Sequence, residues 1–319
     1  MRWLVAGQEA IRDPSDAAVS ERVAQRDAHG PLWLDLERPE PADLALLKDE
    51  FGVHPIALAA AGRAPARPSL TAFQGYAYLA LFTATWRGGQ VHQVPLRIFL
   101  GKQTLITIHD RPEAMLDTVR ERLVTPGEDA PGDLVSYLVV DAFVDTLFAP
   151  LDGLDHAIDA LSDEIIAKPA PAALQRLYRL KHEVAHLHTM LSAQLEVFQR
   201  LLTHLMQMRA SESLSIAMRS VYDRVVRQFE IVDSLRDLVT SAMDVYLSTV
   251  SNNLNVTMAQ LTVVASVFLP LTFLTGFFGM NFGLLVGLLT GPGAFAVGML
   301  VMAASIAVML LIFKRRGLI

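Results

Sequence analysis

The sequence predicts an α+β membrane protein, in which an N-terminal α/β domain is followed by a long stalk helix and two membrane-spanning helices. Hydrophobic residues make up 52% of the 319 residues, which is more than a soluble protein usually carries. Residues 245–313 contain no Asp, Glu, Lys, Arg or His. Nearly all charge precedes this stretch, so the chain divides into a polar first part and an apolar last part.

The first part, residues 1–112, mixes the patterns of strands and helices. Segments rich in strand-forming residues are 31–39, 76–86 and 94–109. Gly101-Lys102 predicts a hairpin turn within the last of these segments. Helical spacing with a proline at the start predicts helices over 41–51 and 55–61. We therefore expect a small sheet covered by helices.

Long helices are predicted from about residue 131 onward. Two helical runs separated by prolines come first, at 133–167 and 172–206. From Leu214 the chain has neither Pro nor Gly until Pro270. A helix that continued to Gly279 would be about 100 Å long at 1.5 Å per residue. We expect a stalk that enters the bilayer.

Two apolar segments close the chain, and each has about the 20 residues that cross a bilayer. The basic residues Lys314, Arg315 and Arg316 follow the second segment and favour a cytoplasmic C-terminus. With two spans the N-terminal domain lies on the same side, and the start of the chain lacks the pattern of a signal peptide. We expect a bacterial-type inner-membrane protein with both termini in the cytoplasm. The predicted parts are a cytoplasmic α/β domain (1–130), a helical region (131–213), the stalk (214–262), the first span (263–282), a periplasmic loop (283–293), the second span (294–313) and a basic tail (314–319).

Charge and cysteine content exclude several classes of function. The net charge is −6 and no basic patch is visible, which argues against nucleic-acid binding. The chain has no cysteine, so it has no disulfide, thiolate metal site or thiol nucleophile.

One face of the stalk helix is acidic, small or hydroxylated in steps of seven residues. The first series is Asp223, Glu230, Asp237, Asp244, Ser251, Met258, Ala265, Thr272 and Gly279. Four residues further on lie Arg227, Ser234, Ser241, Ser248, Asn255, Thr262, Leu269 and Gly276. We call these two series the polar stripe.

An apolar series on the neighbouring face of the stalk helix predicts a side that is buried against other helices. Its members are Val225, Phe229, Val232, Leu235, Val239, Met243, Tyr246, Val250 and Leu254.

The polar stripe favours a pore over a simple coiled-coil anchor. A coiled-coil seam needs apolar residues at these positions, and polar side chains facing lipid are costly. Two spans cannot enclose a pore, so several subunits would each supply one helix around an axis. The alternative is an anchor in which Ser and Thr bond to their own backbone.

The segment FGMNF at 278–282 resembles the signature of the CorA family of magnesium transporters, which is Gly-Met-Asn at the end of the first membrane helix. Residues 221–255 and 267–282 resemble the stalk and first span of that family. LWLDLERP, FGVHP and LITIHDRP resemble its weaker N-terminal landmarks, so the resemblance covers most of the chain.

The resemblance implies a homopentameric funnel in membrane lipid, with an α/β/α cytoplasmic domain, no cofactor and no enzymatic activity. It implies a channel for divalent cations, Mg²⁺ first and also Co²⁺ or Ni²⁺. Its selectivity filter would be Gly279, Met280 and Asn281, where Asn281 oxygens accept hydrogen bonds from the waters of a hydrated ion. The resemblance places Asn255, Met258, Leu261, Leu269 and Thr272 along the pore, with an apolar gate near Met258 and Leu261. The polar stripe adds Asp244, Thr262 and Ala265.

Two departures from the magnesium branch keep an alternative open. The loop 283–293 has no acidic residue, and Ser220 stands where a magnesium-gated branch has an Asp that helps bind a regulatory ion. The related ZntB-like zinc transporters also have glycine-rich loops of this kind. The alternative is therefore a Zn²⁺ transporter that is coupled to protons.

The segment HEVAH at 182–186 matches H-E-x-x-H, the helical zinc site of metalloproteases. His182 and His186 would bind zinc, and Glu183 would be the general base. No third ligand stands at a suitable spacing, and the family has an ordinary charged helix here. A membrane-tethered zinc peptidase, or an incidental or sensory zinc site at His182 and His186, is the more distant alternative.

Overall fold

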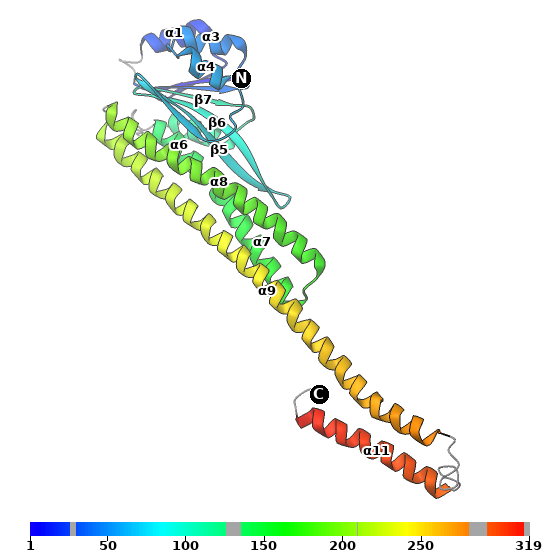
Figure 1. Cartoon of the computed structure of the whole chain (residues 1–319). Helices are drawn as coiled ribbons and strands as arrows, with labels where there is room; N and C mark the ends of the chain where they lie inside the picture. The colour runs from blue at the N-terminus through cyan, green and yellow to red at the C-terminus, as the bar shows by residue number, and fades with distance from the viewer. Residues whose placement is uncertain (26–29, 126–134, 209, 281–291, 316–319) are drawn as a thin grey trace. The chain divides into compact units, whose positions relative to one another are not determined.

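The structure, a computed structural model, describes residues 1–25, 30–125, 135–208, 210–280 and 292–315. The chain forms two compact units, Met1–Met243 and Asp244–Ile319. Helix α9 (Glu212–Phe278) begins in the first unit and ends in the second (Figure 1).

A seven-stranded mixed sheet lies at the centre of the first unit, in the order β2-β1-β3-β7-β6-β5-β4. The strands are β1 (Arg2–Ala6), β2 (Glu9–Arg12), β3 (Leu32–Glu37), β4 (Ser69–Phe73), β5 (Tyr76–Arg87), β6 (Gln90–Gly101) and β7 (Thr104–His109). β3 and β7 are parallel, and the other neighbouring strands are antiparallel. The predicted hairpin at Gly101-Lys102 is confirmed, because β6 and β7 pair with Leu100 opposite Leu105.

Three short helices cover one face of the sheet (Figure 1). They are α1 (Asp16–Ala24), α3 (Pro41–Asp49) and α4 (Pro55–Ala61). The side chains of Leu32, Leu34 and Leu36 alternate toward this layer, as the period of two along a strand requires, and pack in its core. The two predicted helices that begin at Pro41 and Pro55 are confirmed, since proline is well suited to a first helical position that donates no hydrogen bond.

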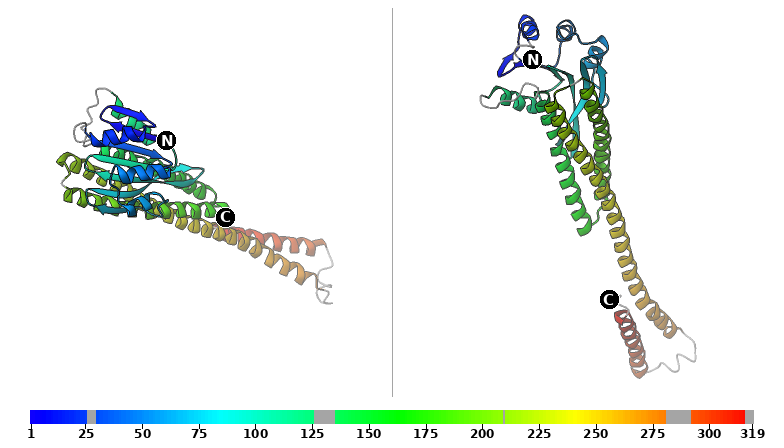
Figure 2. Two further views of the ribbon diagram at one scale, coloured as in Figure 1. Left: turned by 90° about the horizontal axis from the view of Figure 1, so that it is seen from above. Right: turned by 90° about the vertical axis from the view of Figure 1, so that its left-hand side faces the viewer.

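Longer helices cover the other face, which gives the predicted α/β/α arrangement. They are α5 (Ala114–Val124), α6 (Val135–Asp145), α7 (Phe148–Ala167) and α8 (Pro171–Gln207). α7 and α8 lie side by side (Figure 2). Gln194 of α8 accepts a hydrogen bond from the backbone N–H of Phe82 at 2.9 Å, which fixes α8 to β5. A Cβ atom on Gly153 of α7 would lie 2.4 Å from the Trp86 ring, so only glycine permits this contact.

The single helical run predicted over 133–167 is wrong, because the helix is broken between Asp145 and Phe148. Pro150 lies in the first turn of α7 and has no N–H to continue the hydrogen bonding of a preceding helix. The Thr146 hydroxyl donates to the Phe143 carbonyl at 2.7 Å and closes the end of α6.

A cluster of buried polar side chains fixes α5 to the sheet. The Asp35 carboxylate accepts hydrogen bonds from the Thr107 hydroxyl at 2.5 Å and from Arg120 Nη2 at 2.8 Å. His109 Nε2 lies 3.1 Å from the same carboxylate. Burial alone would lower the pKa of His109, but the hydrogen bond and negative charge of Asp35 outweigh it, and the pKa is raised.

The second unit contains the rest of α9 and helix α11 (Pro292–Arg315). Both helices are long and apolar enough, by length and composition, to cross a membrane. α9 continues through Pro270 without ending. Of the predicted basic tail, Lys314 and Arg315 are the last residues of α11, and residues 316–319 lie outside the described residues.

Candidate functional site

The part of α9 within the first unit has a buried side and an exposed side. The buried side carries four members of the predicted apolar series, namely Val225, Val232, Leu235 and Val239. Two polar contacts add to this packing, since Gln228 donates to the Val144 carbonyl at 2.7 Å and Arg224 pairs with Asp145 at 2.9 Å. The buried side therefore holds α9 against α6.

The polar stripe occupies the exposed side of α9. Its members between Asp223 and Ser241 are all exposed in the first unit, and those between Asp244 and Gly279 are all exposed in the second. This includes each of the predicted pore residues on the stripe: Asp244, Asn255, Met258, Thr262, Ala265, Leu269 and Thr272. The prediction of a buried side is wrong at Leu254, which is 61% exposed.

Apolar residues flank the polar stripe on both sides and are also exposed. One flank carries Leu247, Leu254, Leu261 and Phe268, at intervals of seven residues, each 61–63% exposed. The other flank carries Ile231, Leu238 and Val245 at the same interval. Leu261, which the family resemblance places near the gate, thus lies on a flank rather than on the stripe. Exposed apolar rows of this length are typical of surfaces that contact another chain or the membrane.

Two threonine hydroxyl groups of the stripe bond to their own helix. Thr262 donates to the Met258 carbonyl at 2.7 Å, and Thr272 donates to the Phe268 carbonyl at 2.8 Å. This is the bonding expected of threonine in a simple anchor. The same bond uses the hydroxyl hydrogen and leaves the hydroxyl oxygen free to accept a hydrogen bond. The water molecules around a hydrated cation donate hydrogen bonds of this kind.

Gly279 and Met280, the first two residues of the predicted filter, directly follow α9. The helix ends at Phe278, and the Gly279 N–H still donates to the Thr275 carbonyl at 2.9 Å. A Cβ on Gly279 would lie 3.0 Å from that carbonyl, so glycine is favoured here by a close approach of the backbone. Met280 is exposed. Asn281 and most of the loop 283–293 lie outside the described residues.

The H-E-x-x-H segment has a structural contact that the sequence did not predict. The Glu183 carboxylate accepts a hydrogen bond from the backbone N–H of Val91 at 2.9 Å, and His186 Nδ1 lies 3.3 Å from Gln93 Nε2. Both contacts fix α8 to β6. Within the part of the chain that the structure describes, no group of three or more His, Asp or Glu side chains is arranged to hold a metal, so His182 and His186 gain no third ligand there.

These features define a class of protein: an α/β domain followed by two helices that are long and apolar enough to span a membrane, the first of which, α9, begins in the domain and carries a polar face. The chain is 29% identical over 314 residues to the cobalt/magnesium transport protein CorA of Thermotoga maritima, covering 97% of this chain and 89% of that protein. It is 24% identical over 288 residues to the zinc transport protein ZntB of Cronobacter sakazakii, covering 88% and 84%. The fold is similar to the complete structure of the CorA magnesium transporter from Methanocaldococcus jannaschii, with a TM-score of 0.80 at 19% identity over 100% of this chain and 99% of that one.

The chain belongs to the family of CorA-like Mg²⁺ transporter proteins, whose sequence profile matches residues 28–315. The family resemblance predicted from Gly-Met-Asn and the stalk is thereby confirmed.

Proposed function

We propose that the chain forms a homopentameric channel in the inner membrane, in which α9 of each subunit lines a shared axis and divalent cations pass along it. The observation that carries this proposal is the exposure of the polar stripe from Asp223 to Gly279, on the side of α9 opposite its contacts with α6. In this arrangement both termini lie in the cytoplasm, and the apolar face of α11 contacts lipid.

The exposed apolar flanks support the assembly. Leu247, Leu254 and Phe268 would pack against the next subunit, while the polar stripe between the flanks would remain in contact with water. A single chain supplies only one such helix, so several copies must surround the axis. Five is the number that the resemblance to the CorA family implies.

The chemistry of the stripe suits a hydrated cation. Carboxylates such as Asp244 attract cations on the cytoplasmic side, and neutral oxygens at Thr262 and Thr272 bind them weakly enough for release. Met258, with Leu261 beside it, is a candidate apolar gate that closes by excluding water. Asn281 at the entrance would accept hydrogen bonds from the water shell, which Mg²⁺ gives up reluctantly.

Mg²⁺ is the preferred ion, since the matching family and the Thermotoga maritima relative carry that description. The membrane potential would drive uptake with about 4.6 kcal/mol per divalent ion at 100 mV. Zinc transport coupled to protons is the second candidate, supported by the ZntB relative and by the uncharged loop 283–293.

Flux into liposomes containing the full-length protein tests the proposal. We expect Mg²⁺ entry that depends on the membrane potential and does not need a pH gradient. Asn281→Ala should lower flux or selectivity, whereas the control Asn253→Ala, exposed on α9 away from the polar stripe, should leave both unchanged. Transport of Zn²⁺ alone, only with a pH gradient, would overturn the assignment of Mg²⁺. Unchanged transport by Asn281→Ala would overturn the entrance ring.

A further inference from the structure

A cavity of about 300 Å³ opens at one end of the sheet, on the face covered by α3 and α4. It is lined by the connection between α3 and α4, by the turn between β4 and β5, and by the ends of β5, β6 and β7. Its size is at the lower limit of pockets that hold small ligands. It has no part in the proposed ion pathway.

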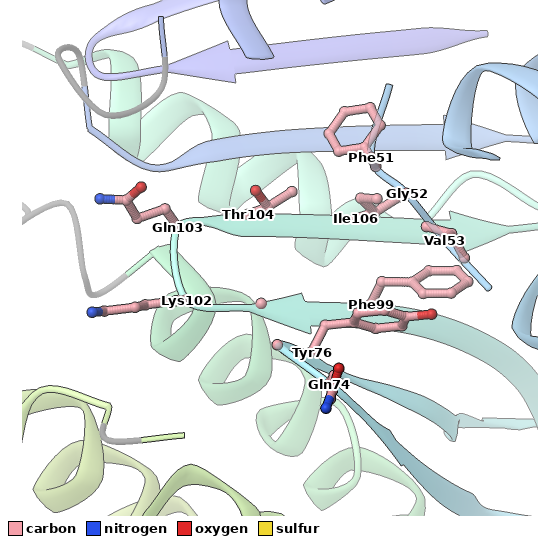
Figure 3. A pocket seen from close by; sticks show the side chains of 12 residues that line it. Phe51, Gly52, Val53, Gln74, Tyr76, Phe99, Lys102, Gln103, Thr104 and Ile106 are labelled. Atoms are coloured by element: carbon pink, nitrogen blue, oxygen red, sulfur yellow. The ribbon is translucent and has the colours of Figure 1, made fainter. Parts of the chain in front are cut away.

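One end of the cavity is aromatic and rigid. Phe51 and Tyr76 are half-buried, and Figure 3 shows them on opposite sides of the end of β7. The Tyr76 ring stacks on Phe73 with ring centroids 4.9 Å apart, and its hydroxyl accepts a hydrogen bond from the His54 N–H at 2.9 Å. Phe99 also contacts this ring, with ring centroids 6.1 Å apart and planes tilted by 47°. Because these contacts fix the ring before any ligand arrives, a planar group can pack against its exposed part at little entropic cost.

The other end of the cavity is polar. Figure 3 shows Lys102 and Gln103 together at the turn between β6 and β7, with Gln74 below Tyr76. Within the described part of the chain Lys102 forms no ion pair, and the side-chain amides of Gln74 and Gln103 have no hydrogen-bond partner. An unpaired ammonium group binds one anionic group, and free amides both donate and accept hydrogen bonds.

We propose that this cavity binds a nucleoside monophosphate, with the base against Phe51 and Tyr76 and the phosphate at Lys102. A purely apolar ligand would leave the ammonium and amide groups unused. A small polyanion would meet only one cation among the described lining residues, and it would leave the aromatic end empty. A planar heterocycle joined to a single phosphate uses both ends of the cavity.

Equilibrium binding to the purified full-length protein in detergent tests the proposal, with AMP, adenosine and inorganic phosphate as separate probes. The buffer contains EDTA, so the result does not depend on transport of any ion. The variants are Lys102→Gln and Lys102→Glu, with Lys168→Gln as the control. Lys168 is an exposed lysine that follows α7 and does not line the cavity.

We expect saturable AMP binding that Lys102→Gln weakens about tenfold, the usual effect of losing one hydrogen bond to a charged group, and that Lys102→Glu weakens further. Adenosine affinity should be the same in all variants, which also shows that they are folded, and Lys168→Gln should bind AMP like the unaltered protein. Absence of saturable AMP binding would overturn the proposal. Equal AMP affinity in Lys102→Gln and the unaltered protein would also overturn it. The same would follow if Lys168→Gln lost as much AMP affinity as Lys102→Gln.

Discussion

Replacing Glu183 distinguishes a structural role of the H-E-x-x-H segment from a catalytic one. The Glu183 carboxylate accepts the N–H of Val91 at 2.9 Å, and Val91 is buried near the start of β6. Glu183→Gln keeps an acceptor oxygen at this position, whereas Glu183→Ala removes it and leaves a backbone N–H unpaired. A general base would lose its function in both variants.

The strength of the hydrogen bond between Glu183 and Val91 determines how far Tm should fall when Glu183 is replaced. A hydrogen bond to a charged group contributes about 1.5–3 kcal/mol, and partial exposure of Glu183 reduces this to about 1–2 kcal/mol. For a unit of this size, each 1 kcal/mol lowers Tm by about 2–4 °C. We therefore expect Glu183→Ala to lower the Tm of the first unit by about 2–8 °C, and Glu183→Gln to lower it by less than half as much.

Thermal unfolding of the full-length protein measures this difference, and cation flux is measured on the same preparations. Glu196→Ala is the matched control, because Glu196 is an exposed glutamate on the same helix. Equal Tm values for Glu183→Ala and Glu196→Ala would refute the structural role. Peptide cleavage that is lost in Glu183→Gln while flux stays normal would refute transport as the only function of the chain.

Three further predictions concern packing, pH and the gate. Gly153→Ala should lower Tm, because its Cβ would lie 2.4 Å from the Trp86 ring, and adding Trp86→Leu should recover part of the loss. His109→Gln should lower Tm more at pH 6 than at pH 9, measured by thermal unfolding. The pKa of His109 is raised in the folded protein, so its stabilising charge is present below the unfolded pKa of about 6.5 and is lost as pH rises through the folded value. Met258→Ser should increase cation flux into liposomes by making the proposed gate easier to wet.

Each of these predictions has an outcome that contradicts it. An unchanged Tm in Gly153→Ala would mean that α7 moves away from Trp86 without cost. If the fall in Tm caused by His109→Gln became larger as pH rises, the neutral His109 ring would be the stabilising form. Flux that falls in Met258→Ser, while Asn253→Ser transports normally, would exclude an apolar barrier at this position.

The sequence predicted several helix starts and the length of α9 well because their signals are local. Prolines at the first position of α3, α4 and α8 mark where these helices begin, and the absence of Pro and Gly before Pro270 predicts the continuity of α9. β1, β2 and β4 were not predicted, since each has only four or five residues and their pairing with other strands decides their structure. The contacts of Asp35 with His109 and Arg120 also depend on tertiary structure, because more than 70 residues separate Asp35 from either partner.

The polar stripe could be predicted because it is a property of one helix, whereas the proposed ion pathway depends on several. If two copies of α9 packed through the stripe, carboxylates such as Glu230 and Asp237 would be forced together at the axis, and the exposed flanks of Leu254 and Leu238 would stay in contact with solvent or lipid. With more helices around the axis, contacts shift to the flanks and the stripe faces a widening lumen. The proposed ring would bury the apolar flanks and leave the acidic stripe in contact with water. We therefore expect that changing a flank residue, as in Leu254→Asp, dissociates the oligomer, whereas Asp237→Ser on the stripe leaves assembly intact. Mass measurement in detergent distinguishes these outcomes, and assembly that survives Leu254→Asp would contradict packing through the flanks.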